Sequence, residues 1–95
     1  MKTEYQNSIV DKIRALRLKR GYSQLTLSSL LDISPGQIGN IETPTRPHKY
    51  TLTQLSIICD EFKVPIVSLF LDNSENMSTN EVVQRLINCI IEYEK

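Results

Sequence analysis

The sequence predicts an all-α fold, because helical hydrophobic spacing and helix-capping signals recur along the chain and no strand-like alternation of any length occurs. The chain has 95 residues, of which 40% are hydrophobic and 23% charged, a composition typical of a folded protein rather than a disordered one. This length accommodates one compact domain with a short appendage.

Three helical segments are expected in the first half of the chain. The first spans about residues 8–20, beginning at a Ser8–Asp11 capping box and ending before Gly21. The second begins after Ser23. The third has Ser34 as its N-cap, with Pro35 at the first helical position and Gln37 completing a capping box.

Three further helices are expected in the second half. A polar loop with two prolines spans about residues 43–50, and Thr51 with Gln54 then caps a fourth helix. Tyr50, at the end of this loop, is expected to pack at a domain edge. Pro65 opens a short fifth helix that ends near residue 71.

The last segment is predicted as an amphipathic helix over residues 79–95, after a linker at residues 72–78. Its apolar residues repeat at helical spacing and form a stripe wider than the preceding domain needs. The helix could fold back on its own domain, or pair with the same helix of a second copy, which we favour. The expected dimer interface consists of Val82, Val83, Leu86, Ile87, Ile90 and Ile91.

The segment between Tyr22 and Glu42 carries the most information. Only a few residues around Asp32 and Ile33 join two short helices, so the helices must cross steeply with their apolar residues meeting inside. The inward positions are Leu27, Leu31, Ile33, Ile38 and Ile41. This pattern predicts a helix-turn-helix, in which the second helix is offered to the major groove of DNA.

Motifs over residues 9–71 resemble the Xre/Cro-type helix-turn-helix regulators in order and spacing. The resemblance implies a five-helix, lambda-repressor-like DNA-binding domain over residues 1–71, with residues 79–95 as an additional C-terminal helix. The matching motifs are Ile13-Arg14-x-Leu16-Arg17, Gly21-x-Ser23-Gln24, Leu30-Leu31-x-Ile33-Ser34, Ile38-x-x-Ile41-Glu42, Leu52-x-x-Leu55 and Val64-Pro65-x-x-x-Leu69-Phe70.

The resemblance also implies roles for individual residues. Gln24 is similar to the residue that hydrogen-bonds a DNA phosphate, and Arg17 with Glu42 resembles the family's internal ion pair. The outward face of the third helix would contact bases. The base-reading candidates are Ser34, Gly36, Gln37, Gly39 and Asn40.

Elementary chemistry favours Asn40 among these candidates. An amide places a donor and an acceptor side by side, which matches the N6/N7 edge of adenine, and a helical wheel anchored on Ile38 and Ile41 points Asn40 outward. Phosphate contacts are expected from the helix-capping and loop residues around it. These are Ser23, Thr43, Arg46, His48 and Lys49.

The sequence departs from the family at two places. Asp32 stands where glycine is usual in the turn, and an Asp adopts left-handed geometry less readily than Gly. Pro35 and Gly36 leave the start of the third helix without long side chains. Either the bare backbone lets this helix approach DNA closely, which we favour, or the helix reads bases poorly and the domain binds something else.

The charge distribution supports a nucleic-acid partner for the first part of the chain only. The formal net charge is zero, but residues 1–70 carry nine Lys and Arg against six Asp and Glu, a net +3. The remainder carries two basic and five acidic residues, a net −3. A mild basic footprint therefore belongs to the helix-turn-helix region.

Other classes of function are disfavoured. We expect Cys59 and Cys89 to be free thiols in a reducing compartment, and no membrane-length apolar run or signal peptide is present, which favours the cytoplasm. No catalytic constellation, metal-ligand cluster, cofactor motif or small-molecule site is visible. The expected function is sequence-specific regulation of transcription, as a repressor that binds double-stranded DNA as a homodimer. The alternative is a protein-interaction module, an antitoxin or adaptor, that binds its partner through the last helix.

Overall fold

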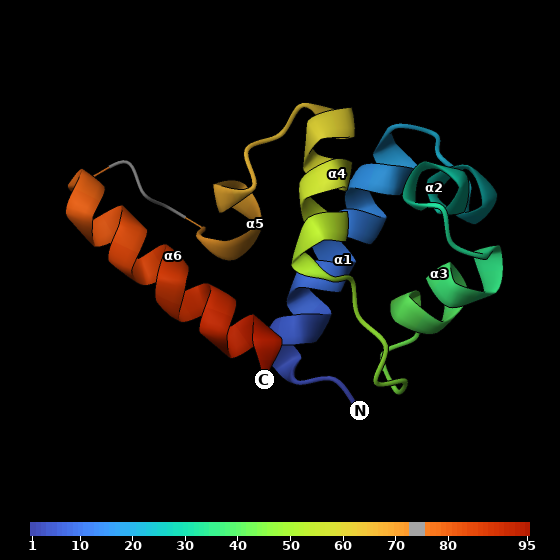
Figure 1. Cartoon of the computed structure of the whole chain (residues 1–95), viewed down its shortest axis with the longest axis horizontal. Coiled ribbons are helices and arrows are strands. Elements are labelled where there is room, and N and C mark those ends of the chain that lie inside the picture. Colours follow the sequence, from blue (N-terminus) through green and yellow to red (C-terminus); the bar gives the residue numbers. More distant parts are fainter. Residues whose placement is uncertain (73–75) are drawn as a thin grey trace.

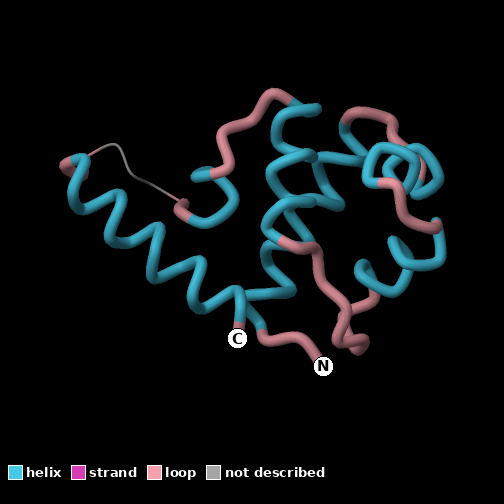
Figure 2. The backbone as a smooth tube through the Cα atoms, in the orientation of Figure 1, coloured by secondary structure: helices cyan, strands magenta, loops and turns pink. Residues whose placement is uncertain are grey.

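The computed structural model describes residues 1–72 and 76–95, and it confirms the all-α prediction. Figure 1 shows the helices in sequence order, and Figure 2 shows that loops alone connect them in the described part of the chain. None of these helices is long and apolar enough to cross a membrane. The helices are α1 (Glu4–Lys19), α2 (Gln24–Leu31), α3 (Pro35–Glu42), α4 (Leu52–Phe62), α5 (Val67–Phe70) and α6 (Thr79–Glu94).

Most helix starts follow from local side-chain chemistry. The Ser23 hydroxyl accepts from the Thr26 amide, and Ser34 with Gln37 forms a complete capping box. Thr51 forms the same box with Gln54. These predicted starts are therefore confirmed.

The predicted start of α1 is wrong. The helix begins at Glu4 rather than near residue 8, because Thr3 and Gln6 form the capping box. The Ser8 hydroxyl instead donates to the Tyr5 carbonyl at 2.6 Å, inside the helix. The predicted stop is confirmed, since Gly21 has φ +73° and the Tyr22 amide donates to the Arg17 carbonyl at 2.9 Å.

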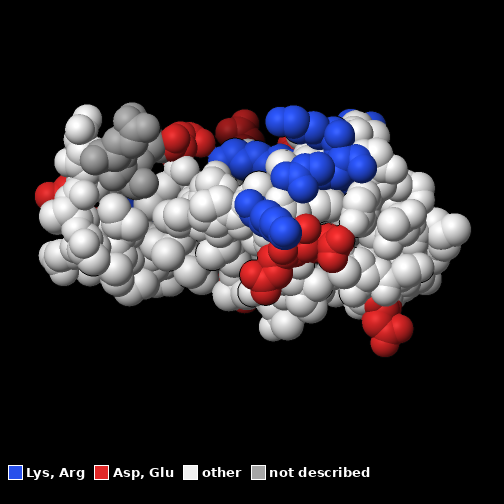
Figure 3. Space-filling view, turned by 90° about the horizontal axis from the view of Figure 1, so that it is seen from above, with Lys and Arg blue, Asp and Glu red and all other residues white. Residues whose placement is uncertain are grey.

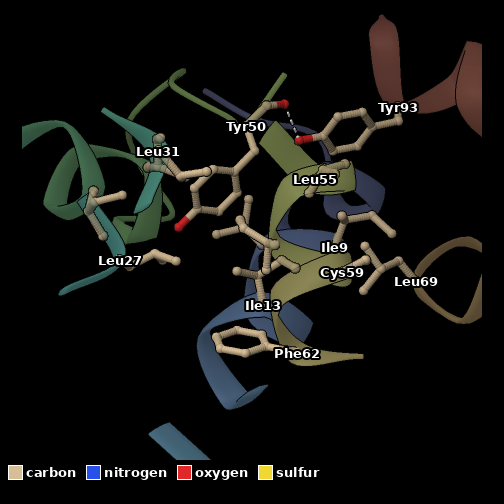
Figure 4. Packing of buried hydrophobic residues seen from close by; sticks show 14 of the residues in the cluster. Ile9, Ile13, Leu27, Leu31, Tyr50, Leu55, Cys59, Phe62, Leu69 and Tyr93 are labelled. Carbon is tan, nitrogen blue, oxygen red and sulfur yellow. Dashed lines mark hydrogen bonds between the residues drawn. The ribbon is translucent and has the colours of Figure 1, made fainter. Parts of the chain in front are cut away.

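The hydrophobic core lies between α1, α4 and the helix-turn-helix pair (Figure 4). Ile9 and Ile13 of α1 and Leu55 of α4 are fully buried. Tyr50, expected at a domain edge, is also fully buried, with its ring among these side chains. The loop after α3 therefore ends inside the core.

The last helix folds back on its own domain. Tyr93 of α6 is fully buried, its ring contacts Phe70 edge to face, and its hydroxyl donates to the Tyr50 carbonyl at 2.6 Å. Part of the predicted linker at 72–78, residues 73–75, lies outside the described residues. In Figure 1, α6 and α3 lie at opposite ends of the long dimension of the molecule.

The apolar residues of α6 divide between two faces. Leu86 and Ile90 pack against the core, so these two predicted interface residues already have contacts within their own chain, and Val82 is half-buried. Val83, Ile87 and Ile91 form an exposed row, with exposed fractions of 49%, 47% and 56%. We call these three residues the α6 row.

Candidate nucleic-acid interface

A tight turn sets the geometry of α2 and α3. Asp32 ends α2 in the left-handed conformation, with φ 55° and ψ 45°, and the Ile33 amide donates to the Ser28 carbonyl at 3.0 Å. Leu27 and Ile38 are fully buried where the two helices meet. Asp32 therefore adopts the left-handed conformation that this turn requires, at a cost of about 1 kcal/mol in backbone strain.

The ion pair between α1 and α3 is present and almost completely buried. Arg17 Nε lies 2.8 Å from Glu42 Oε2, and a second guanidinium nitrogen donates to Oε1 at 3.0 Å. The Arg17 and Glu42 side chains are only 7% and 6% exposed. Arg17 also donates to the Tyr22 carbonyl at 2.7 Å, so one side chain joins α1, the start of the α2 segment and the end of α3.

Gln24 belongs to the same network. Its amide nitrogen donates to Glu42 Oε1 at 3.0 Å, which fixes the side chain at the first position of α2. Arg14, which sequence reasoning did not include among the site residues, is 55% exposed and lies 3.7 Å from Glu42 Oε1. Gln24, Arg14 and Thr43 line a hollow of about 420 Å³, and the Asp11 side chain also lines it.

The base-reading candidates of α3 and its N-cap differ in how exposed they are and in whether their side chains are already hydrogen-bonded. Ser34, Gly36 and Gln37 are exposed, while Gly39 and Asn40 are half-buried. The Gln37 and Ser34 side chains each accept a hydrogen bond from the other's backbone amide, at 3.1 and 3.2 Å. The Asn40 side chain makes no hydrogen bond within the described part of the protein.

The two glycines of α3 are not required by the fold. A methyl group added at Gly36 would lie 3.8 Å from Ser34 Oγ, and one at Gly39 would lie 3.7 Å from Gln24 Oε1, both ordinary contacts. Neither glycine has a positive φ. The two glycines therefore lower the helix propensity of α3, and no contact within the protein requires them.

The loop after α3 carries the other phosphate candidates. Arg46 and His48 are exposed and Lys49 is half-buried, with its ammonium 5.8 Å from the Tyr93 ring centroid. The Thr43 hydroxyl donates to the Gly39 carbonyl at 2.7 Å and so extends the hydrogen bonding of α3. The loop that carries these side chains begins directly after α3, the helix that carries Asn40.

Sequence reasoning missed Lys2. Its side chain is buried, and its ammonium donates to the Thr43 carbonyl at 3.0 Å and to the Arg46 carbonyl at 2.7 Å. Burial lowers the pKa of Lys2 from its ordinary value of 10.5. Nothing in the local sequence signals this contact, because the acceptors lie more than 40 residues away.

Lys12 of α1 and Arg20, the residue after it, bind other parts of the chain. The view from above shows Lys and Arg grouped with acidic side chains (Figure 3). Arg20 donates to the Phe62 carbonyl at 2.6 Å, and Lys12 pairs with Asp72 at 3.1 Å. Arg20 and Lys19 stand at the end of α1, whereas the loop after α3 lies at the opposite end of the molecule in Figure 1.

The crossed α2–α3 pair, braced on α1 and α4, defines a helix-turn-helix domain. The family model for helix-turn-helix proteins matches residues 13–69, more than half of the chain. The chain belongs to this Xre/lambda-repressor-like helix-turn-helix family, a family of DNA-binding transcription regulators rather than of enzymes. Comparisons with curated proteins and with solved structures gave no match.

Proposed function

We propose that the protein is a sequence-specific repressor that binds a pseudo-palindromic operator as a homodimer, with α3 in the major groove. Bound over a promoter, such a dimer excludes RNA polymerase. The function rests on the DNA-binding family, and the mode of action rests on the geometry of α3 and its surroundings.

One observation carries the proposed orientation of α3. The Arg17–Glu42–Gln24 hydrogen bonds hold the end of the helix, and Ile38 and Ile41 are buried on its inner side. The side with Ser34, Gly36 and Gln37 is exposed. A rigid helix with a free outer face suits groove insertion, since base contacts need side chains held in a defined register.

Selection of binding sites from random duplex DNA tests this proposal. We expect an enriched sequence with two inverted half-sites, centred about one helical turn, roughly 34 Å, apart. Titration of the selected site at two salt concentrations should show weaker binding at high salt, because phosphate contacts release counterions. Absence of enrichment, with only weak salt-sensitive binding, would favour the protein-interaction module.

The α6 row supports the homodimer. Val83, Ile87 and Ile91 recur every fourth residue, and the exposed side chains Asn80, Gln84 and Asn88 beside them are uncharged. Glu94, three residues after Ile91, is an exposed acidic side chain at the end of this row. Two copies of the row can pack together as a twofold interface that keeps the two Glu94 side chains at its solvated edge. Leu86 and Ile90 are half-buried and pack against their own core, which holds the helix in place.

The dimer is tested by substitution of Ile87→Glu, with Arg85→Gln as the matched control. Both variants lower the net charge by one at exposed positions of α6, but only the first changes the α6 row, since Arg85 lies on the opposite side of the helix. We expect light scattering to give a monomer mass for Ile87→Glu and a dimer mass for the control, with weaker operator binding by the monomer. A dimer mass for both variants would contradict this interface.

A further inference from the structure

Both ends of the chain hold the loop that follows α3, residues 43–50. At the start of the loop, the Lys2 ammonium binds the Thr43 and Arg46 carbonyls, and the Arg46 amide donates to the Thr43 carbonyl at 3.1 Å. Thr43 is also the C-cap of α3. Lys2 therefore places a positive charge at the carboxyl end of this helix, where it is favourable.

The end of the loop is held by the C-terminal helix. The Tyr93 hydroxyl donates to the Tyr50 carbonyl at 2.6 Å, and the Gln6 amide nitrogen donates to the Tyr93 carbonyl at 2.8 Å (Figure 4 shows the first bond). Gln6 Oε1 in turn accepts from the Thr3 amide. Figure 1 shows the two termini close together beside this loop.

We propose that Lys2 and Tyr93 are positioning residues for DNA binding, which hold the 43–50 loop so that Arg46, His48 and Lys49 meet the phosphate backbone together. The proposal rests on the proposed function of this loop. Neither residue needs to touch DNA, since Lys2 and Tyr93 are both buried. Without them the loop becomes mobile, and ordering it on DNA costs conformational entropy.

The first test needs no DNA. Amide hydrogen exchange is measured on Lys2→Met and on Tyr93→Phe, which remove the ammonium and the hydroxyl with little change in volume. We expect faster exchange in both variants at the amides of residues 43–50, Pro44 and Pro47 having none, and unchanged exchange in α2. The lost hydrogen bonds hold the loop carbonyls in place, so the loop opens more often without them. Exchange at wild-type rates in the loop of both variants would overturn the proposal.

The second test is a double-mutant cycle on DNA binding. Lys2→Met is measured in the wild type and in the Arg46→Gln/Lys49→Gln background, with Lys19→Met as a control that removes an equal charge at the far end of α1. In the wild type we expect Lys2→Met to lower affinity on the order of tenfold and to lower the salt slope, because the loop side chains then make fewer phosphate contacts. In the loop-substituted background we expect a much smaller loss.

The outcomes of the cycle separate the two proposals. Equal losses in both backgrounds would mean that Lys2 acts independently of the loop, which overturns the positioning role. A loss of the same size for Lys19→Met would mean a general charge effect and overturn it too. Failure of the wild-type protein to bind any duplex would instead contradict the proposed function, while the exchange experiment would still decide whether the chain ends hold the loop.

Discussion

At the residue scale, Asn40 differs from Ser34 and Gln37 in the hydrogen bonding of its side chain. Ser34 and Gln37 already bond each other's backbone amides, whereas Asn40 makes no side-chain hydrogen bond within the described residues. Binding DNA through Asn40 therefore requires no internal bond to break. A free amide at this position has both its donor and its acceptor available for adenine.

We expect Asn40→Ala to weaken binding to the selected operator by about 1–3 kcal/mol, because a bidentate base contact is lost. Binding to scrambled DNA should change little. Electrophoretic or fluorescence titration with both duplexes measures the two affinities. Equal losses on the two duplexes would contradict a base-reading role.

The Tyr50 side chain carries a polar group whose burial lowers the stability of the folded protein. Its hydroxyl is buried without a hydrogen-bond partner among the described residues, although its carbonyl accepts from Tyr93. We expect Tyr50→Phe to raise the free energy of unfolding by about 1 kcal/mol, since the variant removes a desolvated polar group and keeps the ring. Urea denaturation measures the change. Tyr93→Phe is the opposite control, because it removes a bonded hydroxyl and should lower stability.

At the element scale, α3 combines a low helix propensity with strong capping. Ser34, Pro35 and Gln37 give the helix a well-defined start, whereas Gly36 and Gly39 weaken it without any steric need. This combination agrees with the close approach of a bare helix backbone to DNA that the sequence suggested.

We expect Gly39→Ala to raise the free energy of unfolding by about 0.5–1 kcal/mol, with a smaller gain for Gly36→Ala in the first turn of the helix. Both variants should weaken operator binding, because each methyl group holds the helix away from the groove. Denaturation and DNA titration of the same preparations measure the two effects. Unchanged affinity in both variants would mean that the glycines do not serve close approach.

Helix starts and stops were predictable at this scale, because caps and glycine stops act over three or four residues. The start of α1 was predicted wrongly, because the sequence offers two possible capping boxes there. Thr3 and Gln6 have the same spacing as Ser8 and Asp11. Long-range contacts favour the earlier start, since the Tyr5 hydroxyl donates to the Phe70 carbonyl and Gln6 donates to the Tyr93 carbonyl. Local sequence does not distinguish the two pairs, and these long-range contacts decide between them.

At the scale of the whole molecule, buried tyrosines make the fold sensitive to alkali. Burial raises the pKa of the fully buried Tyr50 and Tyr93 above the ordinary value of 10.0, and partial burial raises that of the half-buried Tyr5. In the unfolded chain these phenols ionise near pH 10, while in the folded protein they stay protonated. Their contribution to stability is therefore complete below pH 10 and is lost as the pH rises above it.

We expect the free energy of unfolding to fall above pH 10, by up to about 1.4 kcal/mol per pH unit for each tyrosine. Urea denaturation at several pH values between about 8 and 11 measures the slope. The Tyr50→Phe variant should show a shallower slope than the wild type, because it carries one titrating phenol fewer. Identical slopes would show that Tyr50 does not contribute.

Local sequence patterns predicted the all-α class, the helix-turn-helix and most of the helix caps, because hydrophobic period and capping act over a few residues. The resemblance to the family predicted the Arg17–Glu42 pair. Tertiary structure alone decided the burial of Lys2 and Tyr50 and the division of α6 into a packed and an exposed face. These features depend on contacts between residues 41 to 87 positions apart. The physical reason is that a residue's type limits which contacts it can make, while only the packed chain brings its partner within reach.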